Sequence, residues 1–89
     1  MSDPLASFRA QFAARCADAQ AMLAGENPAD EVRRTIHHLA GSADMFGFDE
    51  IGAVARRLDD QAHDGLAYDP KDLKALRVAL AAAVRAEPG

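Results

Sequence analysis

The sequence lacks the features of secreted, membrane-spanning and nucleic-acid-binding proteins. It has one cysteine, Cys16, so no disulfide can form within the chain. It has neither a signal peptide nor an apolar run of membrane-spanning length. Basic residues are scattered or paired and the net charge is −4, so a phosphate-backbone partner has little electrostatic support. We therefore expect a cytoplasmic protein that binds neither nucleic acid nor membrane.

The chain also lacks the parts of an ATP-using enzyme. It contains no Gly-rich phosphate loop, no lysine-and-carboxylate ATP site and no cluster of Mg²⁺ ligands. We expect no cofactor, no metal site and no kinase activity of its own.

Helix-forming residues dominate, whereas strand patterns are nearly absent. No segment sustains an apolar–polar alternation, and β-branched residues are sparse. The 89 residues, 49% of them apolar, suffice for one modest core. Apolar stripes at helical spacing predict helices over residues 4–24, 28–46, 49–64 and 70–86. Because short connections force neighbouring helices to run antiparallel, we expect one all-α domain over residues 1–89, an up-down-up-down four-helix bundle.

Capping residues support these boundaries. Asn27 is expected to cap the second helix with Pro28 at its first position, and Asp69-Pro70 repeats this pattern at the fourth helix. Asp49 is expected to cap the third helix. Glycines stand near the ends of the first three helices: Gly25, Gly47 and Gly65. The predicted core positions are Leu5, Phe8, Phe12, Cys16, Ala19, Leu23, Val32, Ile36, Leu39, Ala43, Phe46, Ile51, Val54, Ala55, Leu58, Ala62, Leu73, Leu76, Leu80 and Val84.

Two adjacent histidines lie on the second predicted helix, away from its apolar stripe. At about 100° per residue, His37 lies about 140° from the centre of the stripe and His38 about 120° from it on the other side. Gly41 follows both histidines by one turn. A glycine inside a helix costs roughly 1 kcal/mol relative to alanine. We interpret Gly41 as a position without a side chain where a partner surface can approach the imidazole.

An exposed imidazole is a competent nucleophile near neutral pH. Arg33 and Arg34 lie one turn from His37, where guanidinium groups can stabilise phosphoryl oxygens. A metal site is disfavoured, because adjacent side chains on a helix diverge by about 100° and no cysteine or carboxylate has a standard ligand spacing from the histidines. His63, near the end of the third predicted helix, is given no function. The residues alone also allow ordinary surface histidines.

The segment HHLAGSADMFGFDEIGAVARRLD, residues 37–59, resembles the signature of histidine-containing phosphotransfer (HPt) domains of bacterial multistep phosphorelays. That signature has an acceptor histidine, an apolar residue, a Gly-Ser pair, a later glycine and an apolar ladder into the next helix. The match makes His37 the acceptor, Gly41-Ser42 the pair and Gly47 the later glycine.

One position departs from that signature. The family usually has a lysine three residues after the acceptor, which helps hold the phosphoryl oxygens, and this chain has Ala40 there. We predict that Arg33 or Arg34 supplies the missing cation, with Arg56 of the third helix as a weaker candidate. Asp59 falls where the family often has an acidic residue.

The resemblance implies a relay function. Through Nε2, His37 would accept a phosphoryl group from an aspartyl phosphate on the receiver domain of a hybrid histidine kinase. It would pass the group to the aspartate of a response regulator, and the receiver would supply Mg²⁺. We expect a monomer. The predicted partner-docking positions are His38, Gly41, Ser42, Met45 and Gly52, although Gly52 could serve close packing instead.

Two other functions remain open. One is a helical adaptor that binds a partner without chemistry. The other is the dimerisation and phosphoacceptor domain of a sensor kinase. Such domains typically follow the histidine with an acidic residue and a later proline, whereas Ala40, Gly41 and Ser42 follow it here.

Overall fold

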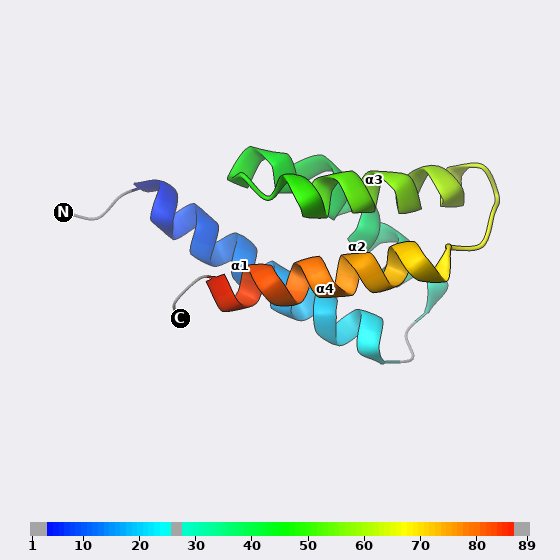
Figure 1. The fold of residues 1–89 in the computed structure, drawn as a ribbon, viewed down its shortest axis with the longest axis horizontal. Coiled ribbons are helices and arrows are strands. Elements are labelled where there is room, and N and C mark those ends of the chain that lie inside the picture. The colour runs from blue at the N-terminus through cyan, green and yellow to red at the C-terminus, as the bar shows by residue number, and fades with distance from the viewer. Residues whose placement is uncertain (1–3, 26–27, 87–89) are drawn as a thin grey trace.

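The computed structural model describes residues 4–25 and 28–86, which form a bundle of four α-helices (Figure 1). The elements are α1 (Pro4–Ala24), α2 (Ala29–Ser42), the 3-10 turn η1 (Ala43–Phe46), α3 (Asp49–His63) and α4 (Pro70–Ala86). Each helix reverses the direction of the one before it, so α1 begins and α4 ends at the same end of the molecule. The predicted all-α, up-down-up-down bundle is confirmed. No helix in the described ranges is long and apolar enough to cross a membrane.

The helices pack as two pairs. α2 packs most extensively on α3 and α1 on α4, contacts between α3 and α4 join the pairs, and α1 and α2 make only a few contacts. The α2–α3 hairpin therefore presents one side to solvent along its length.

The core is apolar. Among the described side chains no polar or charged one is buried. Fully or nearly fully buried residues come from all four helices: Phe12, Cys16, Ala19, Ile36, Leu39, Ala43, Ile51, Val54, Ala55, Leu58, Leu76 and Leu80. Phe12 of α1 stacks on Phe48, which precedes α3, with ring centroids 5.0 Å apart. This contact ties the α2–α3 connection to α1.

Most of the predicted core positions are buried or partly buried, but Phe8 is not. Its side chain is 52% exposed. The first turns of α1 extend beyond the ends of the other helices (Figure 1), so the stripe continues past the core that it was expected to cover. Leu5 and Phe46 lie outside the side chains that the structure describes.

The second helix ends earlier than predicted. It ends at Ser42, whose hydroxyl donates a hydrogen bond of 2.7 Å to the carbonyl of His38. The chain then continues as the tighter 3-10 turn η1, which is ended by Gly47 with a φ of 82°. A side chain disfavours this left-handed conformation, so glycine is needed at position 47.

The helix starts differ in detail from the predicted caps. Pro28 precedes α2 with a ψ of 139° instead of occupying its first position. Asn27 lies outside the described residues. Phe48, not Asp49, is the capping residue of α3, and Asp49 is its first residue. The predicted cap of α4 is confirmed, because Asp69 Oδ1 accepts a hydrogen bond of 2.8 Å from the Lys71 backbone N–H.

Polar contacts join α3 to α4. Asp72 of α4 accepts hydrogen bonds from Arg57 Nε at 3.3 Å and from Gln61 Nε2 at 2.8 Å. Arg57 and Gln61 are four residues apart and share one face of α3. With that face held on α4, the neighbouring position Asp59 is turned towards α2.

Candidate functional site

His37 lies on the side of α2 that faces α3, and its side chain is 69% exposed. Its Nδ1 lies 3.1 Å and 3.2 Å from the two carboxylate oxygens of Asp59, a residue of α3 that is 22 positions further along the chain. A carboxylate only accepts hydrogen bonds, so it favours the tautomer in which Nδ1 carries the proton. Nε2, on the other side of the ring, then holds the free lone pair.

An open groove of about 500 Å³ runs beside this imidazole between α2 and α3. The residues lining this groove, called the His37 groove below, are Asp30, Arg33, Arg34, His37, Asp59, Asp60 and His63. Arg33 and Arg34 make no ion pair with any described residue. The structure therefore brings both predicted arginines into the groove beside His37 with unpaired guanidinium groups.

Arg56, the third predicted cation, is placed elsewhere. Its guanidinium forms an ion pair with the Asp44 carboxylate of η1, and it does not line the His37 groove. Asp44 lies close to position 52 of α3. The ion pair therefore joins η1 to α3 near the end of the hairpin where α3 begins.

The two glycines of the hairpin differ. Gly41 is exposed, and a Cβ added there would meet nothing within 4 Å. Gly52 is buried, and a Cβ there would lie 3.1 Å from the Asp44 carboxyl carbon and 3.4 Å from Arg56 Nη1. Gly41 leaves the backbone open to an approaching surface, as predicted. Gly52 lies beneath the Asp44–Arg56 pair and is not part of the exposed surface, so close packing explains it better than docking.

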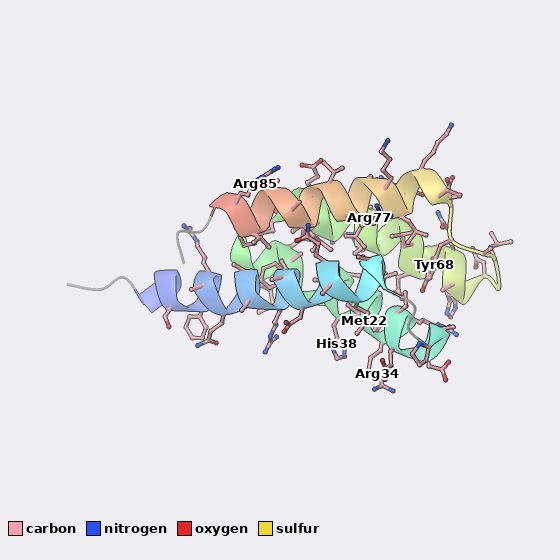
Figure 2. The ribbon with its side chains drawn as sticks, turned by 90° about the horizontal axis from the view of Figure 1, so that it is seen from below. Met22, Arg34, His38, Tyr68, Arg77 and Arg85 are labelled. Carbon is pink, nitrogen blue, oxygen red and sulfur yellow. The ribbon has the colours of Figure 1, made fainter. Side chains whose placement is uncertain are left out.

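The remaining predicted docking residues lie on another side of α2. His38 and Ser42 line a second groove, of about 380 Å³, between α1 and α2. Figure 2 shows His38 and Arg34 projecting from the same side of α2 away from the bundle. Met45 of η1 is 80% exposed. With the exposed Gly41 these residues form a strip along α2 and η1, of which every residue but the partly buried Ser42 is exposed.

Tyr68, in the connection from α3 to α4, is a neighbour of the site that the sequence analysis missed. Burial raises the pKa of the Tyr68 hydroxyl, the Arg33 guanidinium partly offsets this, and the Asp59 carboxylate adds to it. Tyr68 thus lies close enough to both walls of the His37 groove to sense their charges. Its position depends on the path of the α3–α4 connection (Figure 2), which no sequence periodicity reports.

His63 and Asp60 also line the His37 groove without having been predicted there. A sequence signal for His63 did exist. Asp59 and His63 are four residues apart, so both lie on one face of α3. An antiparallel α2–α3 pairing that sets Asp59 against His37 brings His63 to the same groove.

Comparison with known proteins agrees with this geometry. The family model of the Hpt domain matches residues 4–86. Searches of curated proteins and of solved structures found no match. The family match spans nearly the whole chain and includes all four helices. The chain therefore belongs to the Hpt domain family, whose members carry phosphoryl groups on a histidine in phosphorelays and are carriers rather than kinases.

Proposed function

We propose that His37 is the phosphoacceptor of this Hpt domain and that it reacts through Nε2. The observation that supports this is the exposed imidazole whose Nδ1 lies 3.1 Å from the Asp59 carboxylate. An acceptor must be reachable by a large donor protein and must present a lone pair at a defined atom. His37 meets both requirements, whereas no hydrogen bond to a carboxylate selects a tautomer at His38 or His63 within the described residues.

The chemistry follows from this tautomer. The Nε2 lone pair attacks the phosphorus of an aspartyl phosphate, the bond from phosphorus to the carboxylate oxygen breaks, and its electron pair returns to the aspartate. No proton has to leave, because Nδ1 keeps the proton that it donates to Asp59. The phosphorylated ring then carries a positive charge, which the Asp59 carboxylate stabilises. Transfer to a second aspartate reverses these steps and releases a neutral imidazole.

The donor in this proposal is the receiver domain of a hybrid histidine kinase, and the acceptor is the receiver domain of a response regulator. In this proposal the receiver also supplies the Mg²⁺ for the transfer. The domain acts as a monomer that meets each receiver in turn.

Basic groups near His37 would hold the phosphoryl oxygens. Arg33 and Arg34 are the leading candidates, because both line the His37 groove with unpaired guanidinium groups. Arg56 is a weaker candidate, because it must first leave Asp44. Together they would replace the lysine that the family usually has at the position of Ala40.

The exposed strip along α2 and η1 is the proposed docking surface for the receivers. It consists of His38, Gly41, Ser42 and Met45, and it adjoins His37. Gly41 lets the partner surface come within contact distance of the backbone, and the exposed Met45 offers an adaptable apolar contact.

Phosphotransfer from purified, radiolabelled receivers of hybrid kinases from the same organism tests the proposal. We expect acid-labile, base-stable label on the parent protein and on the His38→Gln variant, which keeps His37. We expect no label on the His37→Gln variant. His38→Gln is the matched control, because it removes the adjacent exposed imidazole. Label that persists on His37→Gln would overturn the assignment. Absence of label from every donor, with folded protein, would favour the non-catalytic adaptor.

A further inference from the structure

The basic groups of the His37 groove are not limited to the arginines of α2. His63, the last residue of α3, lines the same groove on the opposite wall. Its imidazole is exposed and makes no hydrogen bond or ion pair with any described residue. It lies one helical turn from Asp59, a rise of roughly 6 Å along α3. A free imidazole is thus present within one turn of the carboxylate that contacts His37.

Side-chain direction also brings His63 and His37 towards each other. Cα–Cβ bonds in a helix tilt towards its N-terminus. His63 follows Asp59 on α3, so its side chain leans back towards the level of Asp59 and His37. His37 leans towards the N-terminus of α2, which in the antiparallel hairpin is the direction of both Arg33 and His63.

The charge of the groove gives a second reason for a basic group on this wall. Three carboxylates line it, those of Asp30, Asp59 and Asp60, and they repel a phosphoryl group bound to His37. The guanidinium groups of Arg33 and Arg34 lie on the α2 wall only. An imidazole donates at least one N–H hydrogen bond in either protonation state, so His63 can contact a phosphoryl oxygen from the α3 wall.

We propose that His63 completes the phosphoryl-binding subsite by donating an N–H hydrogen bond to an oxygen of the phosphoryl group carried on His37 Nε2. The proposal rests on the proposed acceptor role of His37. It assigns the subsite to both helices of the hairpin, with Arg33 and Arg34 on one wall and His63 on the other.

The test uses potassium phosphoramidate, a small phosphoryl donor that needs no receiver domain. The reagent is removed after labelling, and ³¹P NMR follows the second ionisation of the phosphoryl group as pH is varied. The ³¹P resonance of phosphorylated His37 is identified as the one that is missing from the spectrum of His37→Gln. Loss of a nearby hydrogen-bond donor disfavours the phosphoryl dianion. We therefore expect the second pKa of the phosphoryl group on His37 to rise by about half a unit or more in His63→Ala. His63→Arg should restore the parent value.

Lys74→Ala is the matched control, because it removes one exposed basic side chain from α4 and lies outside the groove. It should leave the phosphoryl titration unchanged. An unchanged titration in His63→Ala would overturn the role of His63 and leave the acceptor assignment intact. A rise that His63→Arg does not reverse would also overturn it, since it would show a structural effect. Failure of phosphoramidate to label His37 would instead contradict the acceptor role itself.

Discussion

Asp59 contacts one nitrogen of His37 and leaves the other open, so in the proposed relay it selects the nitrogen that reacts. Its carboxylate lies 3.1 Å from Nδ1 and is 29% exposed, so water screens only part of its charge. The hydrogen bond holds the orientation of the ring, and in the proposed reaction the negative charge of Asp59 would stabilise the positive charge on the phosphorylated ring. Asp59 is therefore a positioning residue whose effect should appear in the rate of phosphotransfer.

Asp59→Asn keeps an oxygen that can accept the Nδ1 hydrogen bond but removes the negative charge. We expect phosphotransfer from a labelled receiver to His37 to slow about three- to tenfold, the size of a partly screened charge-assisted hydrogen bond. Initial rates at fixed receiver concentration provide the measurement. Asp60→Asn is the control, because Asp60 lines the same groove without contacting His37. Equal slowing in both variants would mean that only the general charge of the groove matters.

Gly41 lies within the proposed docking surface on α2. A large side chain at this position should therefore block binding of the receiver without affecting the reactivity of His37. Gly41→Leu places a side chain in open space. Leucine also favours a helix over glycine by roughly 0.8 kcal/mol, so Tm should rise by about 3–6 °C. Transfer from the receiver should be blocked, whereas labelling by phosphoramidate should continue. Circular dichroism and parallel labelling assays measure these effects. Normal transfer from the receiver with helicity preserved would contradict the docking surface.

Gly52 of α3 is buried and crowded, whereas Gly41 of α2 is exposed and open. Gly41→Ala should raise Tm by about 4–8 °C through helix propensity alone. Gly52→Ala should raise it less, because the new Cβ displaces Asp44 and breaks its exposed ion pair with Arg56, which contributes about 0.2–1 kcal/mol. In an Asp44→Ala background the two substitutions should become equivalent. A difference that persists in that background would mean that Gly52 is needed for another contact.

The molecule as a whole buries its one thiol in the core. Cys16 is fully buried, and burial raises the pKa of its thiol from 9.0 to about 11. Above pH 9 the thiol of the unfolded chain ionises while that of the folded chain stays protonated, so ionisation favours unfolding. This contribution to stability is complete below pH 9 and is lost as pH rises towards 11.

We therefore expect the free energy of unfolding in urea to fall between pH 9 and 11. Cys16→Ala should show a smaller fall over the same range, although it is less stable at neutral pH because a buried sulfur is lost. The comparison is needed because Tyr68, whose pKa is also raised, titrates in both proteins. Identical slopes in the two proteins would contradict the contribution of Cys16.

Local pattern explains why so much of the fold could be predicted. Apolar spacing depends only on neighbours within two turns, so it identified four helices and most of their buried residues, although it missed Ala13, Ala79 and Ala83. The residue types favoured at turns and caps also predicted two helix ends. Gly47 adopts the left-handed conformation after η1, and Asp69 caps α4. Phe8 was placed wrongly because periodicity reports which side of a helix is apolar and not how far the neighbouring helices extend.

The sequence by itself therefore determined an all-α bundle with an exposed His37, two arginines one turn away and a bare Gly41, because each depends on one helix. Only the tertiary structure decided which side chains meet across helices. The rotation and register of α3 against α2 set Asp59 on Nδ1 of His37, brought His63 into the groove and paired Arg56 with Asp44. The contacts of Asp59 with His37 and of Arg56 with Asp44 join residues 22 and 12 positions apart, beyond the reach of any helical period.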